Sequence, residues 1–483
     1  MDRATLPYFS IALLSVAALV SEHDAMAAER AALEAAVDDA FKLGTTRLDD
    51  AIVALGVSHP HDYLALYPTS TVTQGAELGE WESSPASDWR SGFFPGALWQ
   101  VYRATGDRAF LAHARAWTAG MESLKEVSID YDLGNRFMAS FGQGYRLSNE
   151  ENDPGGAYRA HAKDVLLAAA ATLDTRFTMG GIPVGALRAL DTYLAPYPVY
   201  IDGMMNLELL FEGWNLSGRP ASGAAKTWYD HAVASAETKM RENVRADGST
   251  YHIVQYNDGT EGTPANGAIH AKITDQGYGN ETTWSRGQAW ALYGFTMVYR
   301  YTRDDPSVRP ERFLGTAMRS ADYFIARLPA NFTADPYNHV PGDFVPPSDF
   351  DAALGEPVGP WNDANRDQVY GDPRPPLHAF TPRDSSAAAV AAAGLFELST
   401  LVPSPVDRAR YRLAAEDILW SLLTFAGPDG KLVYLALDSA HRGILANGLV
   451  AWGYPASSLI YGDYFLLEAM NRHDSCRPQD SGR

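Results

Sequence analysis

Two aspartates at the beginnings of apolar helical segments are the side chains best suited to acid–base chemistry. Asp202 lies in VYIDGMMNLELL, with an isoleucine before it and two methionines shortly after. Burial among apolar groups raises the pKa of a carboxyl group, so we expect Asp202 to keep its proton at neutral pH. Asp132 lies in IDYDLGNRF, among charged and polar neighbours, and we expect it to be ionised. Two such carboxyl groups facing each other could act as an acid–base pair on a sugar.

The structural alternative for both aspartates is helix capping, because aspartate is a preferred residue immediately before a helix. A capping carboxylate accepts a hydrogen bond from a backbone N–H of the first turn and has no chemical role. The sequence alone leaves both interpretations of Asp132 and Asp202 open.

Aromatic and cationic residues near the start of another helical segment could bind an acidic sugar. The stretch ETTWSRGQAWALYGF holds Trp284, Arg286 and Trp290. A guanidinium group binds a carboxylate through two parallel hydrogen bonds, and aromatic faces stack on sugar rings. Trp89, in SDWRSGFFPGALW, allows the same interpretation. The alternative is an interior aromatic cluster whose arginine binds helix carbonyl groups. His252, in STYHIVQYN, is more typical of a structural histidine.

Helical periodicity dominates the chain after about residue 27 and predicts six pairs of helices. One helix of a pair is often rich in glycine, alanine and aromatic residues, and such helices are buried on most faces. We therefore expect an all-α fold, an (α/α)6 barrel with apolar helices inside and amphipathic ones outside. The predicted helices cover 27–55, 92–105, 107–127, 132–145, 157–175, 201–217, 222–242, 285–303, 309–329, 384–401, 405–427 and 458–472.

The barrel would bring several polar residues to one mouth, because they precede or begin inner helices whose starts lie together. They are Asp132, Asp202, Arg286, Asp384 and Asp463. The long proline-rich stretch 331–383 is irregular, and we expect it to form a lid or rim over this mouth.

Composition excludes several classes of function. The net charge of −20, without a basic block, argues against a nucleic-acid partner. The single cysteine, Cys476, excludes an intrachain disulfide and a cysteine-based metal site, and no HExxH motif occurs. We expect neither a metal nor an organic cofactor.

The apolar run at 10–20, followed by Ala25-Met26-Ala27, predicts a signal peptide over 1–27 and a secreted single domain over 28–483. The apolar run is too short to span a bilayer, so we expect no membrane association.

Seven segments, in order, resemble glycoside hydrolase family 88, the unsaturated glucuronyl hydrolases. They are DWRSGFFPGALW, YDLGNRF, YIDGMMNLELL, STYHIVQYN, TTWSRGQAWALYGF, PRDSSAAAVAAAGLFEL and YGDYFLLEA. The resemblance implies an (α/α)6 barrel, Asp202 as the general acid and base, and Asp132 as the second essential aspartate. It also implies pocket roles for Trp89, His252, Gln276, Trp284, Arg286 and Trp290. Asn135 and Ser91 depart from the family pattern, which bears on the sugar bound next to the cleaved bond.

The reaction implied by this resemblance is hydration of an unsaturated uronic acid at the non-reducing end of an oligosaccharide left by a polysaccharide lyase. Three alternatives remain: an unsaturated rhamnogalacturonyl hydrolase acting on pectin fragments, a conventional inverting glycosidase or sugar epimerase, and a non-catalytic sugar-binding relative. Inverting hydrolysis needs a second carboxylate as base, and the epimerase alternative needs a histidine pair that the predicted pocket lacks.

Overall fold

The computed structural model describes residues 8–55, 66–177, 181–189, 196–335, 338–352, 381–437 and 439–475. In this part of the chain, inner helical segments form a closed ring, since each contacts the next and the last contacts the first. The ring consists of α2 (Phe93–Thr105), α4 to α5 (Leu133–Phe137 and Gln143–Leu147), α7 (Gly203–Leu216), α9 (Ser285–Thr302), α12 (Ser385–Leu401) and α14 (Ile460–Ser475). A single π-helical turn, Met138–Gly142, joins α4 to α5.

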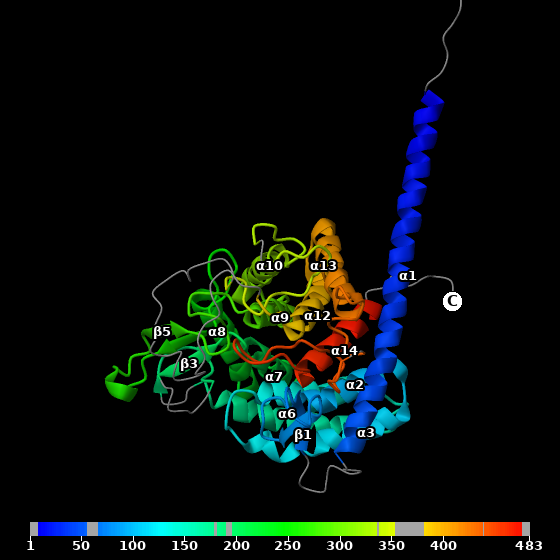
Figure 1. Cartoon of the computed structure of the whole chain (residues 1–483). Coiled ribbons are helices and arrows are strands. Elements are labelled where there is room, and N and C mark those ends of the chain that lie inside the picture. The colour runs from blue at the N-terminus through cyan, green and yellow to red at the C-terminus, as the bar shows by residue number, and fades with distance from the viewer. Residues whose placement is uncertain are drawn as a thin grey trace, which may run out of the picture.

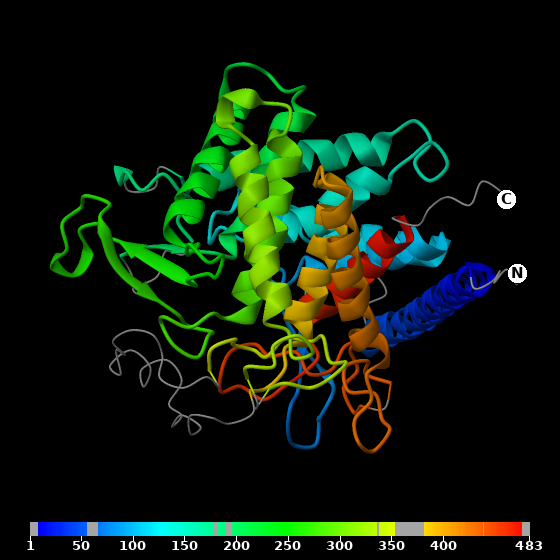
Figure 2. The same ribbon diagram turned by 90° about the horizontal axis from the view of Figure 1, so that it is seen from above.

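A second layer of helices covers the ring (Figures 1 and 2). Its members are α1 (Tyr8–Ala54), α3 (Arg108–Ala119), α6 (Ala157–Asp174), α8 (Ala224–Glu242), α10 (Glu311–Ala326) and α13 (Pro405–Thr424). The alanine-rich α12 is buried along almost its whole length, whereas α10 and α13 bury one face each. The predicted (α/α)6 barrel is confirmed, and each predicted helical segment coincides with a helix. The first helix begins earlier than predicted, at Tyr8, and its N-terminal half extends beyond the other helices (Figure 1).

Strands add two small antiparallel sheets to the barrel. β1 (Leu66–Thr71) pairs with β2 (Trp81–Pro85), and β3 (Tyr197–Tyr200), β4 (Ile253–Tyr256) and β5 (Ile269–Ile273) form a three-stranded sheet. This second sheet lies on the opposite side of the molecule from α1 (Figures 1 and 2). β4 lies within STYHIVQYN, a strand-like run in the sequence, whereas the other strands are short and lack a long alternating pattern.

The three-stranded sheet brings distant segments together at one of its ends. The end of β3, the start of β4 and the end of β5 meet there, since neighbouring strands run in opposite directions. The backbone N–H of Ile201 donates to the carbonyl of His252 at 2.9 Å, which fixes the register at this end. Asp202, His252 and Gln276 therefore follow or precede strands that end beside one another.

The opposite end of the barrel is closed by alternating arginines and glutamates from five inner segments. Arg300 bridges Glu208 at 2.6 Å and Glu397 at 2.5 Å. The other members, Arg146, Arg472 and Glu468, extend the chain of ion pairs around the ring. Such pairs add little net stability, but they specify which helices adjoin. The open mouth with the candidate site lies at the helix starts.

Candidate active site

Asp202 lies immediately before α7 and is held by a tyrosine from the neighbouring inner segment. The hydroxyl of Tyr131 donates to Oδ1 of Asp202 at 2.5 Å, and this tyrosine is itself buried. Burial raises the pKa of Asp202, and the Tyr131 hydroxyl, Lys239, the backbone N–H of Gly203 and Arg286 counteract that rise. The carboxyl group is half-buried, so it remains reachable from the mouth. The pKa of Asp202 is thus raised by burial, and four neighbouring groups limit that rise.

Asp132 lies before α4 and receives two amide donors on one oxygen. The side-chain amides of Asn135 and Asn206 donate to its Oδ1 at 3.1 and 3.0 Å. Burial raises the pKa of Asp132 to about 8, and the charges of Asp130 and Asp202 push in the same direction. We expected Asp132 to be ionised, and the structure contradicts this.

The reason is that the nearby cation already has another partner. Both terminal nitrogens of the buried Arg136 donate to Oδ1 of Asp130, at 2.6 and 3.1 Å. Asp132 therefore lies beside two carboxylates and forms no ion pair within the described residues. The charge of Arg136 lowers the pKa of Asp132 but does not outweigh the effect of burial.

Neither aspartate caps its helix. The side chains of Asp132 and Asp202 make no capping hydrogen bond, although both occupy the position before a helix. Asp384, by contrast, is a cap before α12, because its side chain accepts from the backbone N–H groups of Ser386 and Ala387. The capping interpretation thus applies to Asp384 and does not account for Asp132 and Asp202.

Close packing of two helix starts brings the two aspartates toward each other. A Cβ atom at Gly134 would lie 2.3 Å from the Cα atom of Asn206, so only glycine fits where α4 crosses α7. The backbone N–H of Asn135 donates to Oδ1 of Asn206 at 2.8 Å, which links the helices again. Gly134, in YDLGNRF, therefore allows the close packing that brings the carboxyl groups of Asp132 and Asp202 to the same end of the barrel.

His252 is a neutral, aromatic-packed residue at the end of the sheet. Burial lowers its pKa to about 3, so its ring is uncharged at neutral pH. The ring lies 4.4 Å from that of Trp284, between centroids, and 5.3 Å from that of Tyr200. Its Nδ1 lies 3.0 Å from Oγ1 of Thr274 and 3.2 Å from Oδ1 of Asp275. Its Nε2 is buried without a hydrogen-bond partner in the described part of the chain.

Arg286 is engaged by the protein on both terminal nitrogens. Nη1 donates to Asp384 at 2.8 Å, to the carbonyl of Leu449 at 2.5 Å and to Ser386 at 3.2 Å. Nη2 donates to Oε1 of Gln276 at 2.7 Å and to the carbonyl of Val450 at 2.6 Å.

The Arg286 side chain is only 1% exposed. A forked ion pair with a substrate carboxylate, as we expected, would require these bonds to break. The geometry instead favours the alternative, an arginine that binds carbonyl groups and orients Gln276.

The tryptophans occupy two depths. Trp284 packs on the Arg286 guanidinium, 4.7 Å from the ring centroid, and Trp89 packs on Tyr461 at 5.2 Å between centroids. Tyr461 also covers the guanidinium of Arg286, so these side chains form a continuous aromatic wall at the helix starts. Trp290 lies one turn deeper, is 3% exposed and packs edge-on against Phe465. Trp89 is half-buried and accessible, whereas Trp290 belongs to the core of the barrel.

The predicted lid or rim is seen in part. Of residues 331–383, those from 353 to 380 and at 336–337 lie outside the described residues. The described part passes the start of α9, where Ser285 donates from its backbone to the carbonyl of Ser348 at 3.0 Å. Buried Asp349 accepts from the backbone of Tyr278 at 2.9 Å and from Thr282 at 2.7 Å. This segment therefore borders the mouth beside Trp284.

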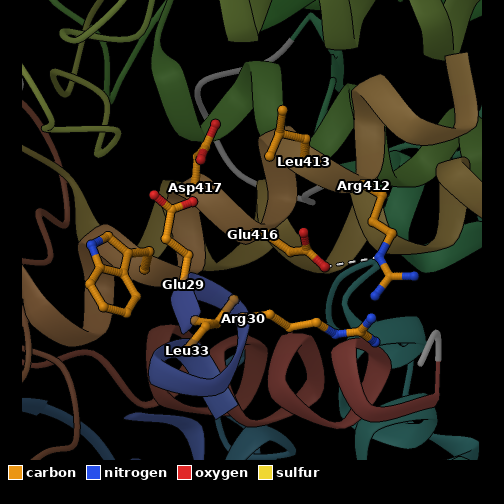
Figure 3. A pocket seen from close by; sticks show the side chains of 8 residues that line it. Glu29, Arg30, Leu33, Arg412, Leu413, Glu416 and Asp417 are labelled. Carbon is orange, nitrogen blue, oxygen red and sulfur yellow. Dashed lines mark hydrogen bonds and ion pairs between the residues drawn. The ribbon is translucent and has the colours of Figure 1, made fainter. Parts of the chain in front are cut away.

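A separate pocket of about 500 Å³ lies between α1 and α13, away from the mouth (Figure 3). Its lining includes Leu33, Leu413 and Trp420 together with charged residues such as Glu29 and Glu416. None of the predicted site residues lines it.

In the described residues no group of three or more histidine, cysteine, aspartate or glutamate side chains is arranged to hold a metal ion.

Sequence comparison with known proteins relates this chain to one group of enzymes. The unsaturated glucuronyl hydrolase of Formosa agariphila is 32% identical over 395 residues, covering 80% of each chain. The chain belongs to the unsaturated glucuronyl hydrolases. An unsaturated glucuronyl hydrolase of Bacillus sp. is 30% identical over 397 residues, 80% of this chain and 86% of its own. No family model matches the chain.

Solved structures lead to the same group. A crystal structure described as an unsaturated glucuronyl hydrolase specific for heparin has a TM-score of 0.67 and 29% identity, covering 92% of this chain and 98% of its own. The enzyme from Bacillus sp. GL1 has a TM-score of 0.64 and 25% identity, covering 91% and 96%. The chain is therefore an enzyme of this family, as the sequence motifs predicted.

Four residues of the site were not predicted from sequence. Tyr131, Asn206, Lys239 and Asp275 all lie against the predicted aspartates or His252. Asp275 has its pKa raised to about 7 by burial and by the charge of Asp202. Tyr131, Asn206 and Asp275 are each within four residues of a predicted site residue, so adjacency was the available signal. Lys239 lies on α8, and nothing in its sequence context points to the mouth.

Proposed function

We propose that this enzyme hydrates the C4=C5 double bond of an unsaturated uronic acid at the non-reducing end of a lyase-generated oligosaccharide, with Asp202 as general acid and base. The observation that carries the proposal is the Asp202 carboxyl, raised in pKa by burial yet held by the Tyr131 hydroxyl at 2.5 Å. Membership of the unsaturated glucuronyl hydrolases supports the same reaction.

The unsaturated uronate is an enol ether, which is protonated on carbon. Protonated Asp202 delivers its proton to C4, and positive charge develops at C5 and the ring oxygen. Water then adds to C5 and gives a proton back to the Asp202 carboxylate. The resulting hemiketal opens, and the glycosidic bond breaks as a consequence. A residue that serves as acid and then as base works best with a pKa near the operating pH.

The environments of the two aspartates support these roles. The charged form of Asp202 is supported by Tyr131 and Lys239 against the effect of burial, so Asp202 can lose and regain a proton. Asp132, with a pKa of about 8, holds its proton at neutral pH in the free enzyme. Its free oxygen can hydrogen-bond a ring hydroxyl, and on ionisation it would favour the cationic transition state. The neutral His252 and the Trp89 face complete the binding wall.

The names of the relatives support a proposal for the substrate class. The Formosa agariphila and Bacillus enzymes are named for unsaturated glucuronyl groups, and a Streptococcus agalactiae relative, 27% identical over 394 residues, for unsaturated chondroitin disaccharides. We propose an unsaturated glucuronyl oligosaccharide as substrate, rather than a pectin-derived rhamnogalacturonyl fragment. Retention of both carboxyl groups favours catalysis over sugar binding alone.

A disaccharide panel tests the proposal. Lyase-generated disaccharides with different linkages and sulfation are incubated with the enzyme, and the ultraviolet absorbance of the unsaturated acid is followed. We expect the absorbance to fall with at least one glucuronyl substrate. Saturated analogues, which lack the chromophore, are followed by release of the free sugar, and we expect none. Constant absorbance across the panel would refute the proposal.

We also propose that the protein is secreted, supported by the apolar run at 10–20 and the cleavage motif that follows it. No helix within the described residues has the length and apolar character needed to cross a membrane. N-terminal sequencing of the protein from its native source should begin at residue 28. A chain that keeps residues 1–27 would contradict secretion by this signal.

A further inference from the structure

A buried lysine lies beside the first turn of α7 and forms no hydrogen bond or ion pair within the described residues. Lys239, on α8, is 1% exposed, and its ammonium group makes no hydrogen bond or ion pair with any side chain or carbonyl in the described part of the chain. Lysine is almost never fully buried unless it is paired. The N-terminal end of α7 also carries positive partial charge, which makes a cation there more costly. Packing alone does not explain a lysine at this position.

The space that Lys239 occupies adjoins Asp202. A Cβ atom at Gly203 would lie 3.2 Å from Cε and 3.4 Å from Nζ of Lys239, and 3.7 Å from the ring of Tyr131. The ammonium group therefore lies beside the residue that follows Asp202, on the same side of Gly203 as the Tyr131 ring. Glycine at 203 leaves room for it.

We propose that Lys239 is a positioning residue for catalysis: its charge, beside the start of α7, favours the ionised form of Asp202, so that one carboxyl group can both give and take the catalytic proton. This inference rests on the proposed function of Asp202. A second favourable interaction is needed because burial alone would keep Asp202 protonated and make it a weak acid toward C4. Tyr131 supplies one favourable interaction through its hydrogen bond, and Lys239 supplies the other through its charge.

The electrostatics of both groups agree with this arrangement. Burial lowers the pKa of Lys239 to about 8, and attraction to Asp202 limits that fall. Because this pKa lies below the ordinary value, the folded state binds the lysine proton less tightly than the unfolded state does, and the charge lowers stability at neutral pH. Lys239 is thus unfavourable for folding, as expected of a residue kept for function. The other groups that face Asp202 are Tyr131, Asp132, Arg286 and Asp275.

The pH dependence of kcat/KM tests the inference. Asp202 must be protonated to begin the reaction, so kcat/KM falls as the pH rises through its pKa. Lys239→Met removes a positive charge that favours the ionised form, which raises that pKa. We expect the alkaline limb to move to higher pH by about one unit and kcat to fall, because a carboxylic acid of higher pKa gives its proton to C4 less readily. Lys239→Arg, which keeps the charge, should restore the wild-type limb.

The matched control is Lys272→Met. Lys272 lies on β5, is half-buried, has its pKa lowered by burial and donates to the carbonyl of Glu242 at 2.6 Å, away from Asp202. Its loss should leave the alkaline limb in place. If the Lys239→Met limb superimposes on that of the wild type, the inference is wrong. If the wild type itself fails to turn over unsaturated uronates, the proposed function has failed instead.

A thermal double-mutant cycle tests the same link without activity. Lys239→Met removes an unfavourable buried charge but also its attraction to Asp202. In the Asp202→Asn background there is no such attraction to lose, so Lys239→Met should raise Tm more there than in the wild-type background. Equal changes in Tm in both backgrounds would show that the two side chains do not interact, and would overturn the inference.

Discussion

Replacing Tyr131 by phenylalanine removes one hydroxyl from the site and should shift the titration of the catalytic acid. The lost interaction is the 2.5 Å hydrogen bond to Oδ1 of Asp202. A hydrogen bond to a charged group is worth about 1.5–3 kcal/mol, and one pKa unit corresponds to about 1.36 kcal/mol. The bond favours the carboxylate, so its loss should raise the pKa of Asp202 by about one to two units.

The assay is kcat/KM against pH, from the loss of absorbance of an unsaturated disaccharide. Because protonated Asp202 is required, the alkaline limb of Tyr131→Phe should lie about one to two pH units above that of the wild type. Tyr229→Phe is the control, since this buried tyrosine donates to Asp305 at 2.9 Å on the outer layer. Its limb should coincide with that of the wild type. A Tyr131→Phe limb that does not move, or that moves to lower pH, would refute the assignment of Asp202 as the titrating acid.

Three further changes have distinct expected outcomes. Asp202→Asn should fold with an unchanged circular dichroism spectrum and lose a factor of about 10²–10⁴ or more in kcat; wild-type turnover would exclude Asp202 as the acid. Arg286→Ala should lower the unfolding free energy by about 3–5 kcal/mol in a denaturant titration, because it leaves Asp384 buried and unpaired; unchanged stability with a raised KM would restore the substrate-grip hypothesis. Treatment with EDTA should leave activity intact, and loss that is reversed by a divalent ion would contradict the metal-free mechanism.

The barrel was predictable because its pattern is local. Inner helices such as α12 are apolar on nearly every face, and their partners are amphipathic, so composition and periodicity alone separate the two layers. Placing Asp132 and Asp202 at helix starts followed from the same periodicity. The sequence did not indicate β3 and β5. Their pairing with β4 brings the segments that hold Asp202, His252 and Gln276 to one end of the sheet.

The roles of individual side chains were less predictable, since they depend on partners far away in the chain. Arg286 was expected to grip a substrate, yet its partners Asp384 and Leu449 lie about 100 to 160 residues later in the sequence. The ionisation of Asp132 was wrong for a related reason, because Arg136 seemed available to it in sequence but is bound to Asp130 in the fold. Local sequence shows which charges are near, but not which pairs form.

Deuterium incorporation tests the central claim that Asp202 protonates carbon and not a bridging oxygen. The enzyme is run in deuterated water on an unsaturated glucuronyl disaccharide, with the saturated disaccharide in parallel, and the released keto acid is examined by mass spectrometry and NMR. Hydration predicts one deuterium at C4 of the product and no cleavage of the saturated substrate. Product without deuterium at C4, or efficient cleavage of the saturated disaccharide, would contradict hydration and make Asp132 and Asp202 a conventional glycosidase pair.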